Sequence, residues 1–234
     1  MDNRNLMKPA FPVIPIYLMV VGSILLYSIY YFGMYDQLLK DGGDAWGYYI
    51  YLPSTLIHQD ITTLDSIASI REQISPHTIS KDNNNLGFDE VNIAENGNPV
   101  IKYTSGVGLM MSPFFLISHF LSLITGKEAN GFTNIYWIGH YMGLVFWVLL
   151  GIFLLIRLLR RYFDLSTALV TSTAILLATN LFYFSVYNPM AHAPLFSLYC
   201  ILIYFSDQFY KKPAYLPAIL IGASAGLITM IRPV

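Results

Sequence analysis

Long blocks of apolar residues alternate with polar stretches along the 234 residues of this chain. A bilayer core that is crossed by a helix needs about 20 mostly apolar residues. Blocks of this kind cover residues 14–35, 135–159, 167–186, 190–206 and 215–231. The pattern therefore predicts an all-α polytopic membrane protein with about five transmembrane helices.

A sixth apolar block, residues 107–125, is long enough to cross but is interrupted by polar residues and a proline. The interrupting residues are Ser112, Pro113, Ser118, His119 and Ser122. If this block does not cross, the basic residues that flank the spans fall on one side, as the positive-inside rule requires. These residues are Arg4, Lys8, Arg157, Arg160, Arg161, Lys211 and Lys212. We therefore predict that residues 107–125 form an interfacial or re-entrant helix. The N-terminus is then cytoplasmic, and residues 36–134 form one large outer loop.

Two parts of this outer loop differ in pattern. Residues 46–58 are apolar and aromatic, with tryptophan and tyrosine side chains that favour the head-group zone. We predict a second interfacial helix there, lying in the membrane plane and kinked at Pro53. Residues 81–99 are polar and rich in turn-forming residues, which indicates a solvent-exposed excursion with the character of a hairpin.

The composition agrees with a membrane protein and excludes several classes. Charged residues make up 12% of the chain, against roughly 25% in soluble domains, and hydrophobic residues make up 55%. The formal net charge of -1 and the lack of a basic stripe argue against a nucleic-acid partner. The single cysteine, Cys200, excludes an internal disulfide framework and a cysteine-based metal cluster.

Asp44 is the first candidate for chemistry, because it lies between the first predicted span and the helix predicted at residues 46–58. A carboxylate at the membrane surface can act as a general base or bind a metal. The neighbouring Gly42, Gly43 and Gly47 permit tight backbone turns and the close approach of a substrate. Helix capping explains the same position equally well, since Asp is a common N-cap residue. The sequence alone leaves both interpretations open.

Lys102 and Tyr103 begin a segment of one cation, hydroxyl groups and glycines that leads into residues 107–125. A cation beside the backbone N–H groups of a helix start can bind an anion such as phosphate. The spacing is not that of a P-loop. An ordinary connector with a solvated lysine is the simpler interpretation, and the sequence slightly favours it.

His192 and Arg232 lie at the ends of predicted spans, on the same outer side as Asp44. Histidine at such a position can bind a substrate phosphate or hydroxyl, although a lone histidine more often caps a helix or contacts head groups. Arginine at the end of a span extends to the head groups or binds a lipid phosphate. Acidic and basic residues are missing from the interiors of the predicted spans, which argues against an ion-coupled transporter.

In their order and sidedness, these short motifs resemble those of the C-type glycosyltransferases, multi-spanning enzymes that take sugars from polyprenyl-phosphate carriers. The likeness rests on Gly43 and Asp44 with Tyr48 and Tyr49, on residues 101–106, on residues 187–192 and on residues 226–232. It covers most of the chain, although each motif is short, and it is strongest to bacterial aminoarabinose and protein mannosyl transferases. The chain departs from the pattern at Thr104, where many relatives have proline, and at Ala45, where some have a second acid.

The resemblance implies a transferase of the bacterial inner membrane that displaces the carrier phosphate directly from the anomeric carbon of its sugar. Asp44 would take the proton from the hydroxyl of a lipid, glycan or protein acceptor, or orient that hydroxyl. The substrate would be bound by Lys102, Tyr103, His192 and Arg232. Of these, the basic residues Lys102, His192 and Arg232 would bind the carrier phosphate. Members of the family are longer, so we expect the chain to be an N-terminal part that is inactive alone. No cofactor is indicated, and a divalent metal is left open because the acids and histidines are too scattered to define a ligand set.

A non-catalytic alternative is a membrane scaffold or transporter-like protein that binds a partner through its outer loop. The excursion at residues 81–99 would then be the recognition surface. A buried cleft that joins Asp44, Lys102 and the outer ends of the helices favours the enzyme, whereas an Asp44 side chain that points into bulk solvent, with no cavity beneath it, favours the scaffold.

Overall fold

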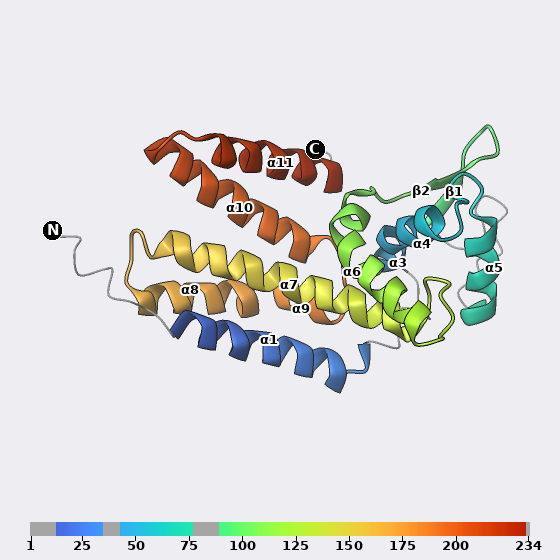
Figure 1. The fold of residues 1–234 in the computed structure, drawn as a ribbon, viewed down its shortest axis with the longest axis horizontal. Coiled ribbons are helices and arrows are strands. Elements are labelled where there is room, and N and C mark those ends of the chain that lie inside the picture. Colours follow the sequence, from blue (N-terminus) through green and yellow to red (C-terminus); the bar gives the residue numbers. More distant parts are fainter. Residues whose placement is uncertain (1–12, 35–42, 77–88, 233–234) are drawn as a thin grey trace. The chain divides into compact units, whose positions relative to one another are not determined.

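The computed structural model describes residues 13–34, 43–76 and 89–232, and this part of the chain is mostly helical. The helices before the polar excursion are α1 (Val13–Tyr31), α3 (Asp44–Tyr49), α4 (Tyr51–Leu56) and α5 (Asp65–Ile74). Two strands follow, β1 (Val91–Ile93) and β2 (Pro99–Ile101). The remaining helices are α6 (Gly106–Ile124), α7 (Asn134–Leu159), α8 (Leu165–Ala178), α9 (Asn180–Val186), α10 (His192–Lys211) and α11 (Tyr215–Ile231). The predicted all-α class is confirmed, with one short hairpin added (Figure 1).

Three of the described helices, α1, α6 and α7, are long and apolar enough to cross a membrane. A fourth candidate arises if α8 and α9 are counted together as one broken span, and α11 is apolar but shorter. The structure therefore gives three or four candidate spans, where the sequence predicts about five. Because α6 is among them by length and composition, the interfacial placement of residues 107–125 stays a prediction.

The helix predicted at residues 167–186 is broken. Its two parts, α8 and α9, meet at an angle of 62°. Thr179 at the break has an extended backbone, and its hydroxyl accepts a hydrogen bond from the N–H of Leu181, 3.2 Å away. The Thr179 side chain thus caps α9, and α8 does not continue through it. Threonine side chains favour such breaks because their hydrogen bonds to nearby backbone groups compete with those of a continuous helix.

The helix predicted at residues 46–58 is also two helices, α3 and α4, which meet at Ile50. The predicted kink at Pro53 is therefore displaced toward the N-terminus. Pro53 has no N–H to donate to the carbonyl of Tyr49, and its ring crowds that carbonyl. The break consequently lies in the turn that precedes the proline.

The predicted hairpin is confirmed over residues 91–101, while residues 81–88 of the excursion lie outside the described part. β1 and β2 pair in antiparallel fashion, with Val91 opposite Ile101. The N–H of Ala94 donates to the carbonyl of Asn98 at 2.9 Å, and Gly97 closes the turn at a φ of 84°. This register places residue 90 beside residue 102, just beyond the paired strands.

The chain divides into two compact units. Unit 1 comprises residues 1–28, 144–187 and 191–234, and unit 2 comprises residues 29–143 and 188–190. Within unit 1, α10 and α11 form an antiparallel hairpin of helices (Figure 1). Unit 2 is built around buried aromatic side chains, among them Trp46, Tyr49, Phe115, Phe132 and Trp137.

The aromatic core of unit 2 fixes the position of α3. The ring of Tyr49 lies 4.6 Å from that of Trp137 and 5.9 Å from that of Phe115, between centroids. Its hydroxyl donates a hydrogen bond to the carbonyl of Gly131. Trp46 stacks on Phe132 at 5.9 Å, and the guanidinium of Arg71 lies over its ring at 4.5 Å. α3, which carries Asp44, is therefore anchored by two large buried side chains.

Candidate functional site

Asp44 is the first residue of α3. The N-cap position belongs to Gly43, whose φ of 80° lies in the region that favours glycine. The capping interpretation of Asp44 is therefore wrong. As an acid in the first turn, Asp44 is favoured by the N–H groups that point out of the start of a helix.

Tyr103 holds the Asp44 carboxylate from a distant part of the chain. Its hydroxyl donates a hydrogen bond to Oδ1 of Asp44, across a separation of 59 residues. The Asp44 side chain is half-buried, and its Oδ2 receives no hydrogen bond from the residues that the structure describes. One carboxylate oxygen is thus fixed, and the other remains able to accept a proton.

The ring of Tyr103 packs directly on α3. A Cβ atom at Gly47 would lie 2.0 Å from Cδ2 of Tyr103, so only glycine leaves room for this ring. The hydroxyl of Tyr51 donates to the carbonyl oxygen of Tyr103 at 2.7 Å, and the ring of Tyr48 lies 4.9 Å away between centroids. α3 and α4 together therefore determine where the Tyr103 hydroxyl points.

Glu90 is a second acid at this site. It is 4% exposed, and its Oε1 accepts a hydrogen bond from the N–H of Gly43, the residue before Asp44. Its carbonyl accepts the N–H of Lys102 at 3.0 Å, as the register of the hairpin requires. Sequence reasoning missed Glu90, because nothing in the pattern of a polar excursion distinguishes Glu90, which is buried, from Asp89 and Glu95, which are exposed.

Lys102 is exposed, one residue from Tyr103. The hairpin places the backbone of Lys102 beside Glu90, and Tyr103 contacts Asp44, so both predicted residues lie in the surroundings of Asp44.

The anion-site hypothesis requires exposed backbone N–H groups at the start of α6, but this start is buried. Gly106, Val107 and Gly108 are buried, and a Cβ at Gly108 would lie 3.3 Å from Cβ of Tyr51. These glycines let α6 pack closely on α4.

The pKa of Tyr103 is raised well above its usual value of 10.0. Burial is the largest cause, followed by the hydrogen bond to Asp44 and by the charges of Asp44 and Glu90. Tyr103 therefore stays protonated across the physiological range and acts as a permanent donor. Oδ1 of Asp44 therefore always has this donor, whereas Oδ2 has none among the described residues.

His192 and Arg232 belong to unit 1, where the structure brings them together at one end of the α10–α11 hairpin. His192 is the first residue of α10 and Arg232 follows the last residue of α11. The two are close enough for the charge of Arg232 to act on the imidazole. The His192 ring stacks on Phe184 at 3.9 Å, and its buried Nδ1 has no hydrogen-bond partner in the described part of the chain. This pair can bind an anion at that end of unit 1.

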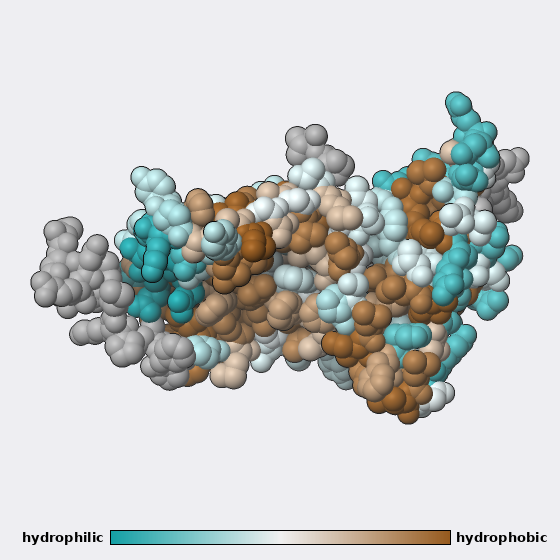
Figure 2. All heavy atoms as spheres, turned by 45° about the horizontal axis from the view of Figure 1, so that its top comes forward, coloured by the Kyte–Doolittle hydropathy of each residue, from teal (hydrophilic) through white to brown (hydrophobic). Residues whose placement is uncertain are grey.

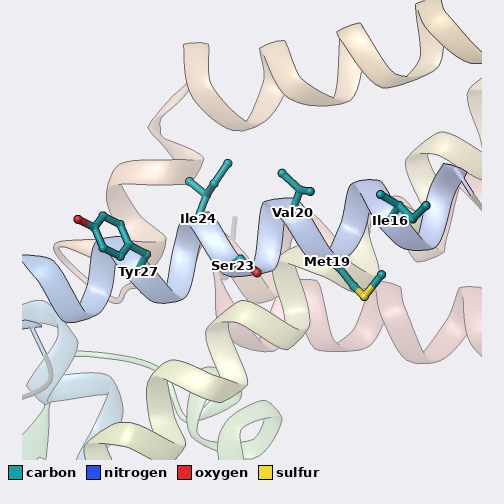
Figure 3. A pocket seen from close by; sticks show the side chains of 6 residues that line it. All are labelled: Ile16, Met19, Val20, Ser23, Ile24 and Tyr27. Carbon is teal, nitrogen blue, oxygen red and sulfur yellow. The ribbon is translucent and has the colours of Figure 1, made fainter.

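A groove on α1, about 400 Å³ in volume, has little chemistry to offer (Figure 3). It is lined by Ile16, Met19, Val20, Ser23, Ile24 and Tyr27. Its side chains are mostly apolar and line one side of the helix, as expected for a surface that faces acyl chains. Among the described residues, no group of three or more His, Cys, Asp or Glu side chains could hold a metal ion.

Comparisons with known proteins found no matching family model, no similar curated protein and no similar solved structure. The function is therefore inferred from the geometry around Asp44 and from the motifs in the sequence.

Proposed function

We propose that this chain is part of a membrane glycosyltransferase that moves a sugar from a polyprenyl-phosphate carrier to an acceptor hydroxyl. The observation that carries the proposal is the half-buried Asp44 carboxylate, fixed at one oxygen by Tyr103 and open at the other. A general base needs a defined position and an accessible lone pair, and Asp44 has both.

The chemistry assigned to Asp44 is a single proton transfer. Oδ2 of Asp44 takes the proton from the acceptor hydroxyl. At the same time, the oxygen of that hydroxyl forms a bond to the anomeric carbon of the sugar. The bond from that carbon to the carrier phosphate breaks, and the phosphate leaves with the electron pair. Tyr103 keeps the carboxylate in place throughout, because its raised pKa prevents it from losing its own proton.

Binding of the carrier phosphate is assigned to cations of the chain. Lys102 is exposed, next to the residue that holds Asp44, and a cation there stabilises the charge that develops on the leaving phosphate. By the family resemblance, His192 and Arg232 of unit 1 are also assigned to the carrier phosphate. No metal is used in the proposed reaction.

In this proposal the five apolar blocks cross a bacterial inner membrane, and residues 107–125 lie at its outer surface. The N-terminus is cytoplasmic and residues 36–134 face the outside, as the positive-inside rule favours. The acceptor is then a lipid, glycan or protein on the non-cytoplasmic side.

The scaffold alternative draws on one observation, the exposed turn of the hairpin. Glu95, Asn96, Gly97 and Asn98 are all exposed, and Val100 is half-exposed. Partner binding would have to reside there. The half-buried Asp44 and its hydrogen bond from Tyr103 support the enzyme, because a general base must be held in a defined position.

The proposal is tested with the full-length enzyme in proteoliposomes, supplied with radiolabelled polyprenyl-phosphate sugars. We expect Asp44→Asn to lower transfer about 10²–10⁴-fold, the usual contribution of a general base. Lys102→Ala is expected to weaken binding of polyprenyl phosphate, measured by retention of the labelled lipid, with Lys127→Ala as the control at an exposed lysine. Wild-type transfer by Asp44→Asn at normal expression would remove Asp44 from the mechanism, and unchanged lipid retention by Lys102→Ala would remove Lys102.

A further inference from the structure

A second polar cluster lies at the end of unit 1 where α7 leads into α8 and α10 leads into α11. Residues 157–164 and 207–215 carry five basic and two acidic side chains. The basic residues are Arg157, Arg160, Arg161, Lys211 and Lys212, and the acidic residues are Asp164 and Asp207. Contacts between the two segments make this end one surface.

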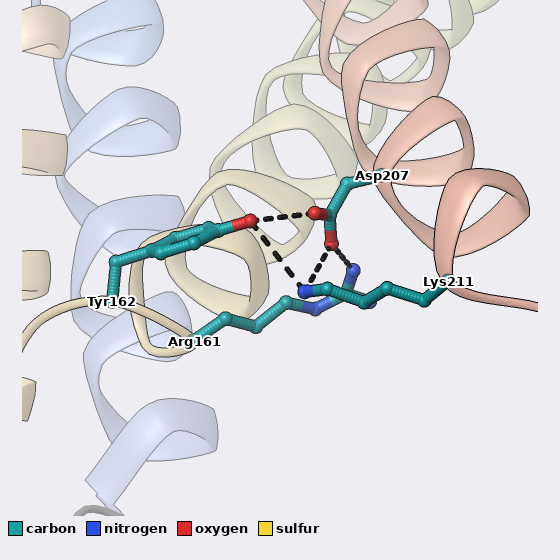
Figure 4. A network of polar contacts seen from close by, with 4 residues as sticks. All are labelled: Arg161, Tyr162, Asp207 and Lys211. Atoms are coloured by element: carbon teal, nitrogen blue, oxygen red, sulfur yellow. Dashed lines mark hydrogen bonds and ion pairs between the residues drawn. The ribbon is translucent and has the colours of Figure 1, made fainter. Parts of the chain in front are cut away.

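Both acids of this surface are occupied by contacts within the protein. Asp207 accepts from Arg161, from the hydroxyl of Tyr162 at 2.5 Å and from Nζ of Lys211 at 3.0 Å (Figure 4). Asp164 caps α8 by accepting the N–H of Thr167 at 2.7 Å.

Arg157 and Lys212 remain without an acidic partner among the residues that the structure describes. Both are exposed, and the Arg157 guanidinium lies 5.8 Å from the centroid of the Phe153 ring. The surface therefore has positive charge that its own acids do not neutralise.

Large aromatic side chains lie in the same two segments as these cations. Tyr210 and Tyr215 are 89% and 90% exposed, and Tyr162 and Phe163 are 57% and 51% exposed. Aromatic rings at this level of exposure are typical of the head-group zone, where an apolar ring and a polar edge are both satisfied. Figure 2 shows hydrophilic residues gathered at this end of unit 1, beside the hydrophobic sides of its helices.

We propose that this basic aromatic surface, residues 157–163 and 210–215, binds the head groups of anionic phospholipids in the adjacent leaflet. Guanidinium and ammonium groups match a phosphate that carries a net negative charge, and the tyrosines fit the depth of the glycerol region. The partner is a lipid because the cations lie at the ends of apolar helices, where head groups are the abundant anions. Each cation near such a membrane contributes about a fivefold gain in binding.

The test is native mass spectrometry of the full-length protein in detergent, titrated with phosphatidylglycerol or with phosphatidylcholine of equal chain length. We expect the wild type to retain phosphatidylglycerol preferentially, and we expect Arg157→Gln with Lys212→Gln to reduce its binding about 10- to 30-fold. Neither residue contacts Asp207, so the network in Figure 4 stays intact. Lys127→Gln, at an exposed lysine of unit 2, is the matched control and should change binding less than about twofold.

Asp207→Asn provides an independent test with the opposite sign. Loss of this carboxylate leaves Arg161 and Lys211 without their internal counter-charge, so binding of phosphatidylglycerol should rise about threefold to fivefold. Equal binding of the two lipids by the wild type would overturn the proposal, as would an unaffected double variant. Displacement of the lipid by low millimolar inorganic phosphate would also overturn it, because the site would then be a simple anion site. None of these readouts uses sugar transfer, so their failure is separate from failure of the proposed function.

Discussion

In the described part of the chain, Asp44 and Asp207 each accept a hydrogen bond from a tyrosine hydroxyl, and their surroundings differ in charge. In unit 1, Asp207 accepts from Tyr162 and also contacts the cations Arg161 and Lys211. In unit 2, Asp44 accepts from Tyr103 and has no cationic partner among the described residues, while a second acid, Glu90, lies close to the same tyrosine.

Asp207 is held by cations within the protein, whereas Asp44 has the environment that the proposed general base requires. The hydrogen bond from Tyr162 and the neighbouring cations lower the pKa of Asp207 to about 2, so this group stays ionised and occupied. Asp44 keeps an open oxygen in a half-buried place with uncompensated negative charge.

The largest effect on stability is expected from Gly47→Ala, which forces a Cβ into the ring of Tyr103. Overpacking of this kind costs about 1–3 kcal/mol, so the unfolding midpoint in denaturant should fall clearly. Gly222→Ala is the control, since a Cβ at Gly222 meets nothing within 4 Å, and it should cost no stability. The effect of Gly47→Ala should be smaller when Tyr103 is also changed to Ala. If the effect is the same with and without the Tyr103 ring, the packing of this ring on α3 is not the cause of the lost stability.

A smaller effect is expected from removing each tyrosine hydroxyl in turn. Tyr103→Phe takes the only described donor from Asp44 and should cost about 1 kcal/mol, as for a part-buried hydrogen bond to a charged group. Tyr162→Phe leaves Asp207 with both of its cations and should cost less than about 0.5 kcal/mol. Equal losses in chemical unfolding would show that the two carboxylates are not distinguished by their partners.

The smallest expected effect is on the pH dependence of folding stability. It has opposite signs for Asp207 and for Tyr103. The lowered pKa of Asp207 gives stability that is full above about 4 and is lost as the pH falls toward about 2. The raised pKa of Tyr103 gives stability that is full below about 10 and is lost as the pH rises further. The difference in thermal midpoint between wild type and Asp207→Asn should therefore shrink in acid, and that between wild type and Tyr103→Phe should shrink in alkali. A difference that shrinks at the wrong extreme would contradict the assignment of these shifts.

Sequence patterns predicted the parts of the fold that depend on local hydrophobicity. The apolar blocks correspond to α1, α7 and α11, and turn-forming residues indicated the hairpin. The bend at Thr179 was missed, because a threonine inside an apolar block caps a helix only when tertiary packing permits the bend. The displaced break near Pro53 shows that a proline acts on the preceding turn.

The candidate site was predictable only in part. Asp44 and Tyr103 were both selected from the sequence, yet their contact joins residues 59 positions apart and depends on how the hairpin leads into α6. Glu90 was missed for the same reason, since only the register that sets residue 90 beside residue 102 brings it to Gly43. Gly47 was selected for substrate approach, whereas the structure gives it the task of admitting the Tyr103 ring.

The catalytic role of Asp44 is tested by steady-state transfer with Asp44→Asn and with Asp207→Asn in the same full-length preparation. We expect Asp44→Asn to lower kcat about 10²–10⁴-fold with little change in KM for the carrier, because the carboxylate acts in the chemical step. Asp207→Asn should keep kcat within about twofold of the wild type, because its carboxylate contacts Arg161 and Lys211 and is assigned no part in the reaction. Equal kcat values for the two variants would contradict the account.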